Sequence, residues 1–266
     1  MNKESYLALK KLRESESPRF KREDFCFSCE RLRKNCLCPL ITPFNTEIHY
    51  VLLMHPKEAR KEKIGTGKIS NLFLSNSKII TGVDFSENIL VNQLLKDENN
   101  LCLLLYPGKT SLNVSKDDLI QFKEVKNKGQ KIIIFILDGT WPCAKKMLRL
   151  SKNLLNLPRI SFSPEMRSSF EIKEQPAEYC LSTLESIHCL IKELNHKEIE
   201  KTNHQEDQML VVFKAMINFQ IECSLNPELS SRKKTKLGYS KREDRITPKK
   251  WQTRNIFLSD TFKDKL

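Results

Sequence analysis

The stretch IIIFILDGTWPCAKKML, residues 132–148, carries the strongest local signal for the fold. Six apolar residues run without interruption into Asp138, and Gly-Thr-Trp-Pro then leads into a lysine-rich segment with helical spacing. A short apolar run bounded by Asp-Gly predicts a strand buried on both faces, as in a parallel sheet covered by helices. An acid and a tryptophan therefore stand at the carboxyl end of a predicted core strand.

The segments on either side extend this pattern into an alternation of strands and helices. Strands are predicted at residues 47–55, 78–83, 101–108, 131–139 and 159–163. Helices are predicted after the turn glycines Gly65 and Gly67, and at residues 87–96, 178–194 and 207–223. Such alternation is typical of an α/β domain, which we place at about residues 46–225.

The remaining segments are expected to be a charged N-terminal lead (residues 1–23), a cysteine cluster (24–45) and a basic C-terminal tail (226–266). The lead has no apolar stretch of the kind found in secretory signals, so we expect a cytoplasmic protein. The longest apolar run, residues 132–137, is far too short to cross a bilayer, so no membrane association is expected.

The charge of the chain indicates an anionic partner. The chain has 46 basic and 33 acidic residues, for a net charge of +13. Residues 229–266 hold 12 Lys or Arg and 4 Asp or Glu, a net +8, with too few apolar residues to form their own core. Nucleic acid is favoured over a membrane surface as the partner. A lysine-rich composition without a specific partner, and a tail that only solubilises, are the alternatives.

Four cysteines with the spacing C-x2-C-x6-C-x-C predict a structural zinc site: Cys26, Cys29, Cys36 and Cys38. Four thiolates close tetrahedrally on one Zn²⁺ and leave no open position for catalysis. Unrelated thiols or two disulfides are the alternatives, and disulfides are disfavoured in the cytosol. The other five cysteines lie in apolar segments and are expected in the core.

The turn after Asp138 has a simple structural interpretation. Asp138 or Thr140 would cap the following helix, with Pro142 in its first turn. Capping does not require Trp141, however. Ligands of open α/β sheets bind beyond the carboxyl ends of the strands, which makes this turn a candidate binding site.

Six signatures in order resemble the DTW-domain family of tRNA-uridine aminocarboxypropyltransferases. The zinc cysteines come first, then H-P-x-E (His55, Pro56, Glu58), T-G (Thr66, Gly67), LYPG (residues 105–108), D-x-T-W (Asp138, Gly139, Thr140, Trp141) and S-T-L-E (Ser182, Thr183, Leu184, Glu185). They span roughly residues 24–220. The chain departs from the family pattern at Lys68, Phe170 and Lys173, which keep the size or charge of the expected residues.

The resemblance implies a SPOUT-like, knotted α/β domain that binds S-adenosyl-L-methionine and acts on tRNA. Its reaction moves the 3-amino-3-carboxypropyl group to N3 of a uridine. The sequence gives no sign of an obligate protein partner. The implied catalytic residues are Asp138, Thr140 and Trp141. The implied cofactor-binding residues are Leu105, Pro107, Gly108, Trp141, Leu181, Ser182 and Thr183. The residues expected to contact RNA are Arg31, Arg33, Lys34, His55, Lys68, Arg167 and Lys173.

Several roles stay open at this stage. Asp138 would act as general base, orient the cofactor or offset its sulfonium charge. Trp141 would wall off the thioether or stack on adenine, or else pack in the core. Ser182 to Glu185 has the form of a capping box, and the same helix start would receive the cofactor's carboxylate. The alternative functions are a SPOUT-type RNA methyltransferase and a non-catalytic zinc-dependent RNA-binding module.

Overall fold

A computed structural model of the chain describes residues 4–5, 22–61, 65–164, 167–170, 172 and 180–226. Lys173, most of the N-terminal lead and the basic tail beyond residue 226 lie outside the described residues. The chain divides into two compact units, one ending at Pro39 and the other beginning at Leu40. The predicted boundaries at residues 23, 45 and 225 stay predictions.

The N-terminal unit is small and built around the cysteines. The 3-10 helix η1 (Arg22–Asp24) precedes a two-stranded antiparallel sheet of β1 (Phe25–Cys26) and β2 (Arg31–Leu32). Glu30 has φ 54° in the connection between them, a left-handed conformation that closes the turn. The 3-10 helices η2 (Arg33–Asn35) and η3 (Cys38–Leu40) follow.

The second unit contains a six-stranded sheet in which every strand pair is parallel. Its strands are β3 (His49–Met54), β4 (Ser77–Thr81), β5 (Asn100–Leu105), β6 (Leu112–Asn113), β7 (Lys131–Asp138) and β8 (Arg159–Ser161). They lie in the order β4-β3-β7-β5-β8-β6. The predicted parallel α/β sheet is confirmed, and only the two-residue β6 was not expected.

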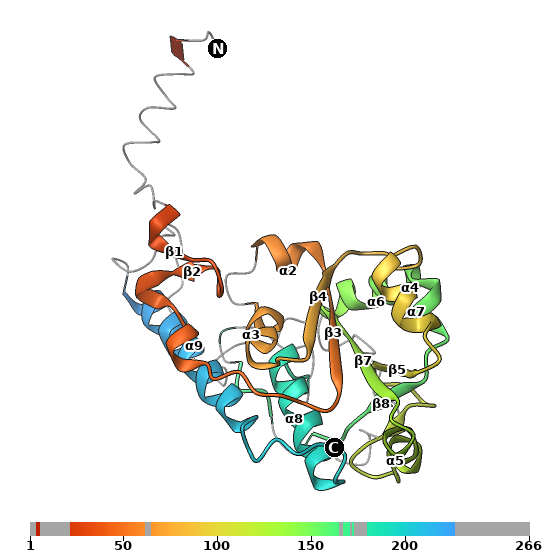
Figure 1. Ribbon diagram of the computed structural model, residues 1–266. Helices are drawn as coiled ribbons and strands as arrows, with labels where there is room; N and C mark the ends of the chain where they lie inside the picture. Colours follow the sequence, from red (N-terminus) through yellow and green to blue (C-terminus); the bar gives the residue numbers. More distant parts are fainter. Residues whose placement is uncertain are drawn as a thin grey trace. The chain divides into compact units, whose positions relative to one another are not determined.

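Strand β7 occupies the middle of this sheet (Figure 1). Ile132 to Ile136 are all buried, which explains why the run is continuously apolar rather than alternating. Burial of each such side chain stabilises the fold by about 1.5–3 kcal/mol. The neighbours of β7 are β3 and β5, both of which precede it in the chain. Any group at the carboxyl end of β7 is therefore flanked by the ends of two other strands.

Helices cover both faces of the sheet (Figure 1). On one face lie α3 (Thr66–Phe73), α8 (Thr183–His196) and α9 (Asp207–Leu225), which contact one another. On the other lie α4 (Ile89–Lys96), α6 (Trp141–Leu150) and α7 (Lys152–Leu155), which share a core cluster with β3, β5 and β7. The remaining helices are α2 (Pro56–Lys61) and α5 (Ile120–Asn127). None of the described helices is both long and apolar enough to cross a membrane.

Three sequence-based expectations need correction. The helix predicted at residues 178–194 begins at Thr183, because Ser182 caps it. Gly67 lies inside the first turn of α3 rather than at a turn before it. Among the five cysteines expected in the core, Cys180 is buried and the partly exposed Cys102 packs against the core cluster, whereas three are only partly buried: Cys143, Cys189 and Cys223.

The segment that leads into β3 is held by a buried carboxyl group. Glu200 accepts hydrogen bonds from the backbone N–H groups of Glu47 and Ile48, at 2.8 and 3.0 Å. Burial raises the pKa of Glu200 from its ordinary 4.5 to about 7, and these two hydrogen bonds only partly oppose the shift. The folded protein therefore holds a proton on Glu200 at pH values where the unfolded chain has lost it.

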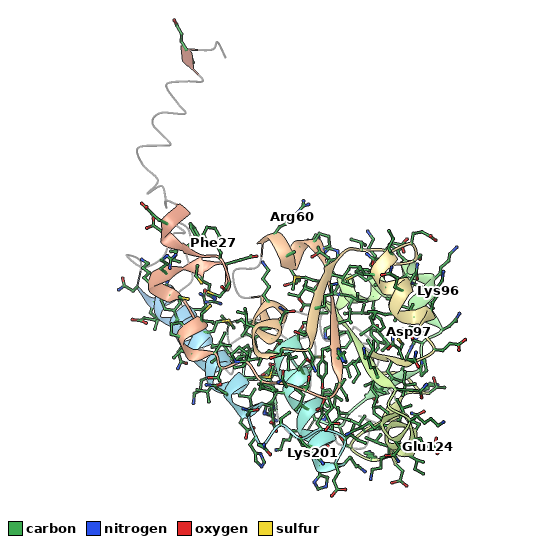
Figure 2. The ribbon with its side chains drawn as sticks, viewed as in Figure 1. Phe27, Arg60, Lys96, Asp97, Glu124 and Lys201 are labelled. Carbon is green, nitrogen blue, oxygen red and sulfur yellow. The ribbon has the colours of Figure 1, made fainter. Side chains whose placement is uncertain are left out.

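This pKa shift predicts that the unfolding free energy lost on Glu200→Ala depends on pH. A raised pKa gives stability that is fully present below pH 4.5 and is lost as the pH rises through about 7. The loss of unfolding free energy caused by the substitution should therefore shrink by roughly 2–3 kcal/mol between pH 5 and pH 8. Urea titrations of both proteins at the two pH values measure it. Glu124→Ala, at an exposed position on α5 (Figure 2), is the control, and its cost should not vary with pH.

Candidate functional site

The carboxyl ends of β3, β5 and β7 bring three of the quoted signatures to one edge of the sheet. Met54, the last residue of β3, is paired in register with Asp138, the last residue of β7. The backbone N–H of His55 donates to the carbonyl of Asp138 at 2.8 Å. The segment after β5, residues 106–108, ends the neighbouring strand. Parallel strands present their carboxyl ends together, and the turn after Asp138, a predicted binding site, lies at this edge.

Asp138 forms the centre of this edge. Its side chain is buried, with the residue only 4% exposed. Its Oδ1 accepts a hydrogen bond of 2.6 Å from the hydroxyl of Thr183, the first residue of α8. The structure thus joins a predicted catalytic residue to a predicted cofactor-binding residue that is 45 positions away. Neither motif alone indicates this contact.

The other oxygen of Asp138 lies against the T-G signature. A methyl group placed on Gly67 would stand 2.3 Å from Oδ2 and 2.6 Å from Cγ of Asp138. Only glycine therefore allows the first turn of α3 to approach this carboxylate so closely. The amino end of a helix carries a partial positive charge, which favours the ionised carboxylate at this place.

The S-T-L-E signature forms the predicted capping box. The hydroxyl of Ser182 accepts from the backbone N–H of Glu185 at 3.3 Å, and Glu185 accepts from the backbone N–H of Ser182 at 2.8 Å. The fully buried Glu185 also accepts from the hydroxyl of Ser168 and the backbone N–H of Ser169, at 2.8 and 2.6 Å. Glu185 therefore fixes the start of α8 to the preceding segment. The role of Ser168 and Ser169 was not evident from the sequence.

The start of α6 differs from the expected cap. Thr140 is the N-cap residue, but its side chain makes no capping hydrogen bond and is exposed. The carboxylate of Asp138 is engaged by Thr183 instead. The simple capping interpretation of this turn is therefore wrong for both residues. Pro142 does lie in the first turn of α6, as expected.

Trp141 is partly buried and faces an aromatic neighbour that sequence analysis missed. Its ring meets Tyr106 edge-on, with centroids 6.3 Å apart and an interplanar angle of 62°. The guanidinium of Arg159 lies 5.5 Å from the centroid of the same tyrosine ring. A methyl group on Gly108 would approach Nη1 of Arg159 to 3.3 Å. Trp141, Tyr106 and Arg159 therefore form a row along the edge, next to the predicted cofactor loop.

Burial raises the pKa of Tyr106, and the positive charge of Arg159 acts in the opposite direction. Tyr106 was within reach of sequence analysis because it lies inside the quoted LYPG signature. Arg159 could not be found from the sequence, because its proximity to Tyr106 depends on the pairing of β8 with β5. The other predicted cofactor-binding residues, Leu105, Pro107 and Leu181, are each partly buried.

His55 caps the helix that begins directly after β3. Its Nδ1 accepts from the backbone N–H of Lys57 at 3.1 Å, so the ring caps α2. Burial lowers the pKa of His55, and the charges of Lys57 and Lys146 lower it further. The neutral ring therefore carries its proton on Nε2. Its predicted RNA contact stays a prediction.

The other predicted RNA contacts of this unit are Lys68 and Arg167. The ammonium group of Lys68 donates to the carbonyl of Ala59 at 2.9 Å and so holds α3 to α2. Arg167 is exposed. Their contacts with RNA likewise stay predictions.

Basic side chains flank His55. Lys57 and Arg60 are exposed on α2, and Lys146 is exposed on α6. Arg60 projects away from the sheet (Figure 2). Within the part of the chain that the structure describes, none of these three cations forms an ion pair with an acid. We refer to them as the basic rim, and their free charges suit an anionic ligand.

The four predicted zinc ligands come together in the N-terminal unit. Their sulfur atoms all lie within 4.8 Å of one another, with Cys26 to Cys38 at 3.7 Å and Cys29 to Cys36 at 3.6 Å. Tetrahedral coordination with Zn–S bonds of about 2.3 Å places sulfurs about 3.8 Å apart. The donor set therefore fits Zn²⁺. Backbone N–H groups of Cys29 and Ser28 help to lower the pKa of Cys26 to about 6, whereas burial raises that of Cys38.

The basic residues of this unit differ in exposure. Arg31 is half-buried, and the thiols of Cys29 and Cys36 lie near enough to act on its charge. Arg33 and Lys34 are exposed, and Nε of Arg33 donates to the carbonyl of Glu23 at 2.7 Å. Their expected contacts with RNA stay predictions.

Metal analysis tests the zinc site. Purified protein should contain one zinc per chain, and the double substitution Cys36→Ser with Cys38→Ser should abolish it, because two ligands cannot retain a structural Zn²⁺. The matched control is Cys189→Ser with Cys223→Ser, which changes two thiols outside the cluster. Zinc retained at full stoichiometry in the first variant would disprove the assignment.

The approach of Gly67 to Asp138 predicts a coupled effect on stability. Alanine usually stabilises a helix relative to glycine by up to about 1 kcal/mol. Here Gly67→Ala should instead destabilise the protein by about 1–3 kcal/mol, because the new methyl overlaps the carboxylate. In an Asp138→Ala background the clash is absent, so the same substitution should become neutral or stabilising. Additive effects in this double-mutant cycle, measured by urea unfolding, would show that the two residues do not interact.

Comparison with known proteins agrees with the residue pattern. A family model, the DTW domain, matches residues 23–221. The tRNA-uridine aminocarboxypropyltransferase 2 of Macaca fascicularis is 27% identical over 221 residues, which cover 82% of this chain and 70% of that protein. Its counterpart in Mus musculus is 28% identical (77% of this chain, 66% of that protein). That of Drosophila melanogaster is 30% identical (68% of this chain, 71% of that protein). No solved structure matches with significance.

Proposed function

This chain belongs to the DTW-domain family, and from that premise we propose that it is a tRNA-uridine aminocarboxypropyltransferase. The proposed donor is S-adenosyl-L-methionine, which supplies an electrophilic carbon next to its sulfonium. The new bond forms between that carbon and N3 of a uridine in tRNA, the carbon–sulfur bond breaks, and 5′-methylthioadenosine leaves. The uridine N3 proton passes to a base.

One observation carries this proposal. The hydrogen bond of 2.6 Å from Thr183 to Asp138 unites the D-x-T-W and S-T-L-E signatures at the carboxyl edge of the sheet. Separate motifs of a family form a site only if the fold brings them together, and here they meet around one buried carboxylate. The LYPG segment at the end of β5 flanks the same edge.

Asp138 has two proposed uses in the reaction. Uridine N3–H is a weakly acidic imide, and a carboxylate within hydrogen-bonding reach would take its proton as attack proceeds. The same negative charge, in a site shielded from water, would also favour the cationic sulfonium group. Thr183 and the amino end of α3 hold the carboxylate in one orientation, which keeps it ready for either role.

Trp141 is proposed to select the carbon that is transferred. All three carbons bonded to a sulfonium are electrophilic, and the methyl group is the least hindered. A transferase for the longer chain must therefore turn the methyl away from the nucleophile. The partly buried Trp141, braced edge-on by Tyr106, presents a rigid apolar surface suited to the methyl or the adenine ring.

The basic rim is proposed to contact the tRNA backbone. Lys57, Arg60 and Lys146 are exposed and carry charges that no acid of the described residues neutralises. Contacts with phosphates release counterions, so they strengthen binding without selecting a sequence. Because Lys57 and Lys146 act on the pKa of His55, they lie near the end of β3 and thus beside the site.

The knotted SPOUT-like arrangement belongs to the proposal as well. Its support is the strand order, in which β7 lies between β3 and β5, and β8 lies between β5 and β6. Such inserted strands distinguish this sheet from one with a sequential order, and each crossover starts at the carboxyl edge because the strands are parallel. The segments proposed to hold the cofactor, residues 105–108 and 181–183, follow at that same edge.

Asp138→Asn tests the proposal directly. The amide keeps the size of the side chain but loses the charge and the base, so transfer should fall by about 10²–10⁴-fold. The melting temperature should change little, because the amide oxygen still accepts from Thr183. The readout is mass spectrometry of nucleosides from tRNA incubated with protein and S-adenosylmethionine. Asp118→Asn, at an exposed position, is the matched control.

The same readout separates the alternatives. A product heavier by one methyl group would identify a methyltransferase. Failure of S-adenosylmethionine to bind, with tRNA still bound, would leave an RNA-binding module. Near-normal turnover by Asp138→Asn would remove Asp138 from the chemistry.

A further inference from the structure

Arg159 is a half-buried cation at the site, and the proposed reaction does not use it. Its guanidinium lies over the ring of Tyr106 and next to Gly108 of the predicted cofactor loop. The described residues include no acid that pairs with it. Burying a charge partly, without a partner, costs stability unless a ligand compensates.

We propose that Arg159 binds the carboxylate of the 3-amino-3-carboxypropyl group, and so recognises the part of the cofactor that is transferred. This inference rests on the proposed function, since it presupposes S-adenosylmethionine as donor. A planar guanidinium is suited to a carboxylate because it donates two parallel hydrogen bonds to the two oxygens.

The other candidate for this carboxylate, the start of α8, is poorly suited to it. Thr183 donates to Asp138, and the backbone N–H groups of Ser182 and Glu185 are used within the capping box. Two buried acids, Asp138 and Glu185, lie at or beside this helix start. A third carboxylate would meet like charges there, so this end of the site favours cationic groups of the ligand instead.

The distance between the two ends suits an extended ligand. β8 is the second neighbour of β7, with β5 between them, which places them about 10 Å apart at ordinary strand spacing. Trp141 and Tyr106 are in edge-on contact beside Arg159, on the face covered by α4, α6 and α7. The carboxylate of Asp138 lies toward α3 and α8 on the other face. A ligand that crosses the carboxyl edge would therefore place its sulfonium near Asp138 and its carboxylate near Arg159.

Gly108 keeps the guanidinium accessible. A side chain at this position would come within 3.3 Å of Nη1 of Arg159 and would narrow the approach to it. The cation–π contact with Tyr106, at 5.5 Å from the ring centroid, restrains the guanidinium, so fewer rotamers are lost on binding. Lysine would keep the charge but lose both the plane and the paired donors.

The test compares three ligands on the full-length protein by calorimetry. They are S-adenosylmethionine, its decarboxylated analogue, and 5′-methylthioadenosine, which lacks the whole transferred group. Arg159→Gln should weaken S-adenosylmethionine roughly ten- to a hundredfold, the usual effect of losing hydrogen bonds to a charged group. The other two ligands should bind the variant as they bind the wild type. Arg159→Lys should give an intermediate loss, again confined to S-adenosylmethionine.

Arg149→Gln is the matched control, because Arg149 is exposed in the last turn of α6, at the far end of that helix from Trp141. It should leave all three affinities unchanged.

Two results would overturn the inference. Equal weakening of the three ligands by Arg159→Gln would show that Arg159 only supports Tyr106. Unchanged binding of all three, with weaker tRNA binding, would show that the anion it meets is an RNA phosphate. If the wild-type protein bound none of the three ligands, the proposed function itself would fail.

Discussion

The site depends on one constraint, which is that a carboxylate is buried at the carboxyl end of the central strand. An ionised carboxylate without partners is too costly to bury. Asp138 is stabilised by the hydroxyl of Thr183 and by the amino end of α3, which Gly67 allows to come close. These two contacts require that α3 and α8 lie on the same face of the sheet, and they do. The burial of Asp138 and the placement of α3 and α8 therefore depend on each other.

The start of α8 serves both the fold and the site. Ser182 and Glu185 satisfy each other's backbone groups and hold the segment of Ser168 and Ser169. Because this reciprocal capping needs only the first and fourth residues of the signature, the hydroxyl of Thr183 is left to point at Asp138. A capping box alone explains Ser182 and Glu185, whereas the contact with Asp138 explains why the residue after Ser182 is a threonine.

Sequence reasoning found the parts of the site that lie within one segment. The apolar run before Asp138, the cysteine spacing and the capping box are local patterns, and the structure has each of them. It missed the row formed by Trp141, Tyr106 and Arg159, because that row depends on strand order. β8 lies beside β5, although 53 residues lie between Leu105, which ends β5, and Arg159, which begins β8. Pairing over such a distance follows from packing and is not a local property of the sequence.

The expected cap at Thr140 failed for a related reason. Local preference favours a hydroxyl or carboxylate over the first turn of a helix, but a tertiary partner, Thr183, engages Asp138 instead. The charged groups along the edge differ in whether another protein group neutralises them. Asp138 is compensated by protein groups and stays fixed, whereas Arg159 and the basic rim have no acid partner among the described residues. A charge that protein groups neutralise is held in place and orients a ligand. A charge without a protein partner contributes binding free energy when an oppositely charged ligand arrives. The site thus holds its negative group internally and leaves its positive groups to be neutralised by what binds.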